Sequence, residues 1–185
     1  MRARMALKIA GIEVEIREIS LREKPAHMLQ VSSKGTVPVL IFQEGTVIDE
    51  SLDIMLFAFK KQALGGSVCE VSRALIIEND GSFKRALDAY KYPERFPNRT
   101  QSEHRELGEI FLQKLECLLS IDNYLVSAAP GLADIAIFPF VRQFAAVDKD
   151  WFETSPYPKL KAWLHNWINS ELFKSIMIKN PTYVG

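Results

Sequence analysis

KGTVPVLIFQEGTVIDESL, residues 34–52, is the stretch that decides the fold. Residues 37–42 are a run of Val, Leu, Ile and Phe interrupted only by Pro38, residues 43–45 form a short glycine-containing turn, and residues 46–48 return as a second brief strand. This pattern predicts a hairpin. Pro38 cannot donate a backbone hydrogen bond to a ladder, which places it at a sheet edge or at the turn into the strand.

The start of this hairpin offers a backbone that can bind a peptide. If the peptide bond before Pro38 is cis, as tight functional turns allow, the N–H and C=O groups of Val37 face outward and stay unpaired. A backbone of this kind accepts an extended peptide in the manner of a sheet edge, without help from any side chain. We therefore expect a small peptide as the ligand.

Asp49-Glu50-Ser51 follows the hairpin directly and precedes an apolar helical run from Leu52 to Phe59. These three residues therefore occupy a helix N-terminus, where free N–H groups and the helix dipole favour an anionic group. The Ser51 hydroxyl adds a donor, and Glu50 adds a carboxylate that can bind an ammonium group. The simpler alternative is that Asp49 and Ser51 only cap the helix.

The hairpin with its proline just before the cap favours a binding site over a simple cap. Glu50 and Ser51 can hold both charged groups of a free α-amino acid. Val37 can hold the amide of that ligand, and Lys34 can hold a distal carboxylate. The expected ligand is thus a short peptide with an amino acid at one end and a carboxylate at the other.

At these residues the chain resembles the glutathione S-transferase family. V-P at residues 37–38 matches the third strand of the family's thioredoxin-like domain, and E-S at residues 50–51 matches the start of its third helix. In that family these positions bind glutathione, a tripeptide with the two end groups expected above. The resemblance implies that glutathione, as a substrate, is bound by five residues: Lys34, Val37, Pro38, Glu50 and Ser51.

Composition limits the other possibilities. The 185 residues suffice for one large domain or two small ones, and 23 basic residues balance 23 acidic ones. Zero net charge indicates neither nucleic acid nor membrane as a partner. Cys69 and Cys117 lack the spacing of a disulfide framework or a zinc site, so we expect no metal and a reducing cytoplasm. We assign His27, His104 and His165 to the surface or to local hydrogen bonds.

The first domain, residues 1–64, reads as helix, strand, short helix, hairpin and helix. Met1–Ala10 is the first helix, with Gly11 as its C-cap, Ile12–Arg17 alternates as a half-buried strand, and Pro25–Val31 is the short helix. A thioredoxin-like fold has one more strand in front of the first helix. The family's catalytic Tyr, Ser or Cys follows that strand, at a position that falls before Met1. We therefore assign no catalytic residue here and expect Met1 to be an internal residue of a longer ancestral chain.

The second domain, residues 65–185, reads as entirely helical after the linker Gly65-Gly66-Ser67. Apolar residues at helical spacing predict helices over residues 69–90, with a weak point at Gly81, over 102–120 and around 160–168. The fold class is therefore an α+β thioredoxin-like N-terminal domain that lacks its first strand, followed by an all-α C-terminal domain. This order of domains resembles that of the glutathione S-transferases.

A second motif lies in the helical half, at Pro130–Ala136. Many glutathione transferases have Ser or Thr three residues before an Asp at the start of their sixth helix, where the two form a buried capping box. Asp134 fits that pattern, and Gly131 stands where the hydroxyl residue would be. We expect both to be structural, with a loss of stability of a few tenths to about 1 kcal/mol from the glycine.

Two functions remain open on the sequence alone. The first is a glutathione transferase that conjugates or reduces small electrophiles, with Tyr90 or Tyr92 in the electrophile pocket. The second is a non-catalytic regulatory or interaction protein on the same fold. Lys34, Glu50 and Ser51 favour the first, and the missing catalytic segment favours the second. Family members are usually dimers, and we expect a homodimer here.

Overall fold

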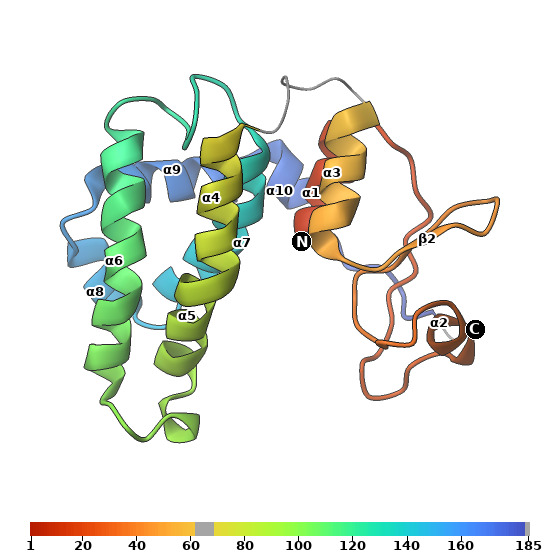
Figure 1. Ribbon diagram of the computed structural model, residues 1–185, viewed down its shortest axis with the longest axis horizontal. Helices are drawn as coiled ribbons and strands as arrows, with labels where there is room; N and C mark the ends of the chain where they lie inside the picture. Colours follow the sequence, from red (N-terminus) through yellow and green to blue (C-terminus); the bar gives the residue numbers. More distant parts are fainter. Residues whose placement is uncertain (62–68, 184–185) are drawn as a thin grey trace. The chain divides into compact units, whose positions relative to one another are not determined.

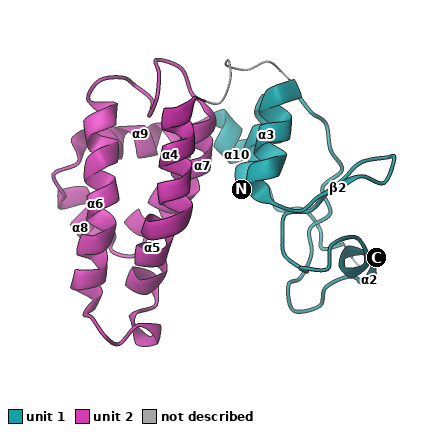
Figure 2. Cartoon of the chain, in the orientation of Figure 1, with its two compact units in different colours: residues 1–64, 171–185 teal, residues 65–170 magenta. Residues whose placement is uncertain are grey.

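The computed structural model describes residues 1–61 and 69–183, and the chain divides into two compact units (Figures 1 and 2). Unit 1 contains residues 1–64 and 171–185, and unit 2 contains residues 65–170. The C-terminal segment therefore lies with the first unit, whereas the sequence-based boundaries placed it in the helical domain. The expected linker, Gly65-Gly66-Ser67, lies outside the described residues.

Unit 1 is a small α+β unit built around a helix pair. It contains α1 (Arg2–Ile9), α2 (Ala26–Val31), β1 (Leu40–Ile41), β2 (Val47–Ile48), α3 (Ser51–Lys61) and α10 (Glu171–Ile176). α1 packs along α3, and α10 packs against α1 (Figure 1). Met5 and Ala6 on α1 and Met55 and Ala58 on α3 are fully buried, so the seam between these two helices forms the core of the unit.

The first helix ends where the sequence predicted. Gly11 has a φ of +62°, which is the left-handed conformation that glycine adopts without strain. The Ile12 N–H donates to the Leu7 carbonyl at 3.0 Å, and the Gly11 N–H donates to the Lys8 carbonyl at 3.1 Å. These two bonds form a Schellman motif, which satisfies the last free carbonyls of the helix.

The predicted strand at Ile12–Arg17 is wrong. The structure has no strand there, and Val14 and Ile16 are 40% and 42% exposed. A strand needs a neighbour for its backbone groups, and the described part of unit 1 provides none along this segment. Just beyond it, Glu18 forms an isolated parallel bridge with Thr182 of the C-terminal tail, where the Tyr183 N–H donates to the Glu18 carbonyl at 2.6 Å.

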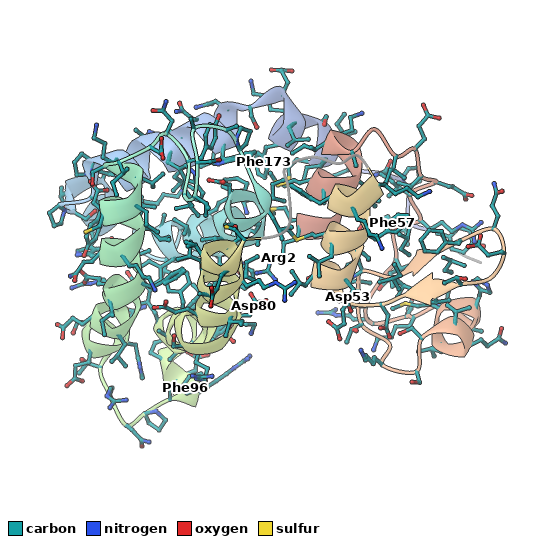
Figure 3. All side chains as sticks on the ribbon, turned by 45° about the horizontal axis from the view of Figure 1, so that its top comes forward. Arg2, Asp53, Phe57, Asp80, Phe96 and Phe173 are labelled. Carbon is teal, nitrogen blue, oxygen red and sulfur yellow. The ribbon has the colours of Figure 1, made fainter. Side chains whose placement is uncertain are left out.

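The hairpin is present, with shorter strands than predicted. β1 and β2 are antiparallel with Leu40 opposite Ile48 and Ile41 opposite Val47. The turn closes through Phe42, whose N–H donates to the Thr46 carbonyl at 2.8 Å. The first strand begins only at Leu40 because Pro38, close before it, has no N–H for the ladder. The Phe42 ring packs edge-on against Phe57 of α3, which Figure 3 labels, and this contact fixes the hairpin to the helix.

The regular elements among the described residues of unit 2 are all helices. It contains α4 (Glu70–Glu78), the π-helix η1 (Asn79–Phe83), α5 (Lys84–Lys91), the short η2 (Pro93–Arg95), α6 (Gln101–Leu119), α7 (Leu132–Ala145), α8 (Lys149–Thr154) and α9 (Pro158–Asn169). α4, η1 and α5 form one continuous helical run, as the sequence predicted. The expected weak point at Gly81 lies inside the π-helical segment, where the helix is locally overwide.

α7 is the central helix of unit 2. Eleven of its 14 residues are buried, which is typical of a helix that is apolar on all sides. Aromatic rings surround its C-terminal half: the Phe144 ring stacks on Phe83 with 5.5 Å between ring centroids and lies tilted against Tyr90 at 4.9 Å. Gly108 of α6 faces Phe144 so closely that a β-carbon there would overlap the ring. A glycine is therefore needed for α6 and α7 to approach each other.

No helix within residues 1–61 or 69–183 has the length and apolar character required to cross a membrane.

Candidate functional site

The hairpin entry in unit 1 presents an open backbone. The peptide bond between Val37 and Pro38 is cis, and Val37 is 51% exposed. Within the described residues the backbone of Val37 makes no hydrogen bond. Both its N–H and its C=O are therefore available to an extended peptide.

α3 begins beside this hairpin. Its first residue is Ser51, and the Ile54 N–H donates to the Glu50 carbonyl at 3.0 Å as the first bond of the helix. The N–H groups of residues 51–53 lie ahead of that bond and point out of the helix end. The Ser51 hydroxyl also has no partner among the described residues. Asp53 contributes a carboxylate to the same first turn (Figure 3).

Lys34 lies over the start of α3 in two ion pairs. Its Nζ is 2.7 Å from Oε1 of Glu50 and 3.3 Å from Oδ1 of Asp49. The hydrogen bond to Glu50, and then that to Asp49, raises the pKa of Lys34. All three side chains remain at least a quarter exposed. The structure thus brings together Lys34 and Glu50, which the sequence predicted for opposite ends of a ligand.

Sequence reasoning missed one residue of this cluster, Ser32. Ser32 is 3% exposed, and its hydroxyl donates to Oδ2 of Asp49 at 2.9 Å. The hydrogen bonds from Ser32 and Lys34 lower the pKa of Asp49. Asp49, a helix cap in the simpler of the two interpretations, connects the 32–35 loop to the end of the hairpin. No pattern in the sequence indicates a contact between residues 17 positions apart.

The second motif is a buried polar cluster in unit 2. Asp134 is 1% exposed and accepts three hydrogen bonds, from the Gly131 N–H at 3.0 Å, the Leu125 N–H at 3.0 Å and the Trp163 indole at 2.9 Å. Burial raises the pKa of Asp134, and the three donors oppose that shift. Gly131 supplies a backbone donor and no side-chain bond to the helix. This cluster joins α9 to the loop that precedes α7.

The two tyrosines expected in an electrophile pocket, Tyr90 and Tyr92, differ in their burial. Tyr90 is 2% exposed and packs on Phe144, so it belongs to the core of unit 2 and does not line an open pocket. Tyr92 lies at the surface end of α5, where the Arg95 guanidinium and the Lys91 ammonium lie 4.5 and 4.9 Å from its ring centroid. The expectation for Tyr90 was therefore wrong.

The cysteines and histidines add no further reactive cluster. Cys69 and Cys117 are both free and exposed. His104 is 4% exposed and lies 2.9 Å from the Phe96 carbonyl, while His165 pairs with Glu153 at the surface. In the described ranges no group of three or more His, Cys, Asp or Glu side chains is placed to hold a metal ion.

Unit 1 has a hairpin entered through a cis proline and a helix N-terminus beside it, and the unit that follows is helical. This combination is typical of a thioredoxin-like domain joined to a helical domain. Residues 1–60 match the family description "Glutathione S-transferase, N-terminal domain", and residues 101–166 match "Glutathione S-transferase, C-terminal domain". The chain belongs to the glutathione S-transferase family.

Individual relatives agree with this assignment. The chain is 29% identical over 182 residues to glutathione S-transferase U19 of Arabidopsis thaliana, covering 92% of this chain and 81% of the relative. It is 26% identical to glutathione S-transferase omega-1 of Mus musculus, covering 98% of this chain and 77% of the relative.

Solved structures show the same fold at low identity. A Pseudomonas fluorescens glutathione transferase family member with two glutathione bound gives a TM-score of 0.78 at 14% identity, covering 94% of this chain and 86% of that one. The bacterial transferase BphK, solved as a ternary complex, gives a TM-score of 0.77 at 21% identity, covering 94% of this chain and 90% of that one.

Proposed function

We propose that this protein binds glutathione in unit 1 through Lys34, Val37, Pro38, Glu50 and Ser51, and that it conjugates glutathione to small electrophiles or uses it to reduce them. The observation that carries the proposal is the Lys34–Glu50 pair at the start of α3, 2.7 Å apart and exposed. It presents one cation and one anion beside free helix N–H groups and an open strand edge. Glutathione carries the complementary groups.

In this proposal the ligand replaces an internal ion pair. The α-ammonium group of glutathione binds Glu50, and its α-carboxylate binds the α3 N-terminus and Ser51. Its distal carboxylate binds Lys34. Val37 pairs with the peptide backbone of the ligand. The Lys34–Glu50 pair must open first, so the ligand has to supply both an ammonium and a carboxylate to compensate for that loss.

Titration calorimetry with glutathione tests the binding step. We expect Lys34→Met and Glu50→Gln each to weaken binding about tenfold, because each removes a charge-assisted hydrogen bond. Lys60→Met is the matched control, since Lys60 lies on the exposed last turn of the same helix. If wild type shows no heat of binding up to millimolar glutathione, the proposal is wrong.

Turnover separates this proposal from the second candidate, a non-catalytic regulatory or interaction protein. Conjugation is followed with 1-chloro-2,4-dinitrobenzene, and reduction with a mixed disulfide of glutathione. Thiol activation in the family is the task of a Tyr, Ser or Cys, and we assign that role to no residue of this sequence. Binding without turnover in both assays would favour the second candidate.

We also propose that the protein is a cytoplasmic homodimer. Three large apolar side chains on α4 and α6 are strongly exposed in unit 2, with Ile77 at 72%, Ile110 at 62% and Leu107 at 42%. The ion pair between Glu78 and Lys114 connects these two helices. Apolar side chains gathered on one pair of helices are typical of an interface between subunits.

Light scattering after gel filtration measures the oligomeric state. We expect a mass near twice 21.0 kDa for wild type and near 21.0 kDa for Ile110→Glu, because the charge cannot be buried at the interface. Ile121→Glu is the control, since Ile121 is 80% exposed and lies beyond the end of α6. A monomeric wild type would contradict the proposal.

A further inference from the structure

The C-terminal tail, residues 177–183, lies in unit 1 together with the segment of residues 12–18 (Figure 2). The Tyr183 N–H donates to the Glu18 carbonyl at 2.6 Å, and Thr182 forms a parallel bridge with Glu18. The Tyr183 ring also lies 4.9 Å from the guanidinium carbon of Arg17, which is a cation–π contact. The tail is therefore attached to the end of this segment through its backbone and through a side chain.

Glu18 connects this attachment to the core of the unit. Its Oε2 atom accepts a hydrogen bond from Nη2 of Arg4 on α1 at 2.6 Å. α1 in turn packs along α3. The tail is thus added at a point that α1 holds in place.

The rest of the segment has an open backbone. From Glu13 to Arg17, no backbone N–H or C=O group has a hydrogen bond to a described residue. The side chains of Val14 and Ile16 are 40% and 42% exposed. Unpaired backbone in a sequence that alternates apolar and charged residues can accept a further strand.

The tail occupies one position of this open edge. A strand directs the backbone groups of alternate residues to the same edge, so Val14, Ile16 and Glu18 share the edge that the tail meets. An antiparallel pair of two copies of this edge, centred on Ile16, places Val14 of each copy opposite Glu18 of the other. Such a pair requires the Glu18 carbonyl, which already accepts the Tyr183 N–H.

The side chains of this arrangement complement each other. With Ile16 opposite the same residue of a second copy, Glu15 of each copy lies opposite Arg17 of the other, which gives two ion pairs between the strands. Within one chain, Nε of Arg17 lies 2.9 Å from Oε1 of Glu15, and both side chains are exposed, so they can exchange partners. The charge pattern therefore favours a second copy of this chain on this edge.

We propose that the tail is an inhibitory strap: Tyr183 occupies the Glu18 carbonyl and so prevents residues 13–18 from pairing with the same residues of a second copy. Release of the tail exposes a self-complementary edge, and two copies then pair as antiparallel strands. This association uses unit 1 and is separate from the subunit interface proposed on α4 and α6 of unit 2. It does not require glutathione.

Tyr183→Pro tests the strap, because proline has no N–H to donate to Glu18. The variant is made in the Ile110→Glu background, which removes the interface proposed in unit 2. We expect light scattering across a dilution series to reach twice the mass measured for Ile110→Glu alone. Lys179→Pro is the matched control in the tail, since the Lys179 N–H has no hydrogen bond among the described residues, and it should leave the mass unchanged.

A disulfide bond reports the register of the pairing. In a Cys69→Ser, Cys117→Ser and Tyr183→Pro background, Ile16→Cys should cross-link two copies, because opposite Cα atoms of such a pair are about 5.5 Å apart. Glu13→Cys is the control, since in this register the two copies of residue 13 lie roughly 20 Å apart. With Tyr183 restored, Ile16→Cys should no longer cross-link.

An exchange of charges completes the test. In Tyr183→Pro, Arg17→Glu should abolish the association because it places like charges opposite each other, and adding Glu15→Arg should restore it. Thermal melts confirm that each variant is folded before it is measured. An unchanged mass in Tyr183→Pro, a doubled mass in Lys179→Pro, or equal cross-linking at residues 13 and 16 would overturn the proposal.

Discussion

The two polar clusters of this protein differ in how completely their hydrogen bonds are satisfied. In unit 2, Asp134 is 1% exposed and accepts three protein donors. In unit 1, Glu50 and Lys34 are half exposed and hold each other beside a Val37 backbone that has no partner among the described residues. A satisfied, buried cluster stabilises the fold, whereas an exposed cluster with spare donors can bind a ligand. The variants below test that difference.

The largest effect is expected at the satisfied cluster. Asp134→Ala leaves the Leu125 N–H and the Trp163 indole buried without an acceptor, which we expect to cost roughly 3 to 5 kcal/mol in the free energy of unfolding. Urea denaturation measures it. Glutathione affinity of the remaining folded protein should stay within twofold of wild type, because Asp134 lies in unit 2. A loss of affinity without a loss of stability would reverse the roles assigned to the two clusters.

The pH dependence of the same residue gives an independent check. Burial raises the pKa of Asp134, so the folded protein keeps this proton to a higher pH than the unfolded chain. Stability from this group therefore increases as the pH falls through the folded pKa, is complete below the unfolded value near 4, and is lost as the pH rises. We expect the stability of wild type relative to Asp134→Asn to increase from pH 7 toward pH 4.

The second effect concerns the packing around the core of unit 2. Gly108→Ala places a methyl group against the Phe144 ring, which is 0% exposed and cannot move aside, and we expect a loss of about 1 to 3 kcal/mol. Gly81→Ala is the matched control, since the nearest atom to its β-carbon is the end of the Arg85 side chain at 4.0 Å. The control should be neutral or slightly stabilising. Equal losses in both melts would contradict the close approach of α6 and α7.

The third effect concerns ligand discrimination in unit 1. Glu50→Gln removes the partner of the ligand's ammonium group and also releases Lys34. We expect glutathione to bind about tenfold more weakly, and its analogue without the α-amino group to bind more tightly than it does to wild type. Calorimetry with both ligands measures the two changes. If the variant loses affinity for both ligands equally, the Lys34–Glu50 pair does not compete with the ligand.

The smallest effect is expected at the residue behind the pair. Ser32→Ala removes the hydrogen bond to Asp49 and loosens the loop that carries Lys34, so glutathione binding should weaken about two- to threefold. Ser33→Ala, at the next and exposed position, is the control. The loss should disappear with glutathione monoethyl ester, whose blocked carboxylate makes no ion pair with Lys34. A loss that persists with the ester would place the effect elsewhere.

Most of unit 2 was predictable because a helix forms its backbone hydrogen bonds within its own segment. The spacing of apolar residues predicted the helical run with its weak point at Gly81 and the long α6, and both are present with small shifts in their ends. The Gly11 cap and the hairpin were predictable for the same reason, since their hydrogen bonds join residues close in sequence. The family assignment followed from the V-P motif at residues 37–38 and the E-S motif at residues 50–51.

The Ile12–Arg17 segment shows where this reasoning fails. Its alternation of apolar and charged residues is typical of a strand, yet a strand forms only where a second strand lies beside it. Tyr90 fails for a related reason: a tyrosine near a helix end can face a pocket or the core, and only the position of α7 decides which. Contacts between distant segments, and not local pattern, settled both.

The sequence by itself determined the family, the hairpin, the start of α3 and the helices of unit 2, because each depends on residues within one or two turns of each other. Only the tertiary structure decided that Lys34 pairs with Glu50, that Ser32 supports Asp49, and that residues 171–183 lie with unit 1. Those placements depend on chain closure over many residues, for which a single sequence carries no local signal.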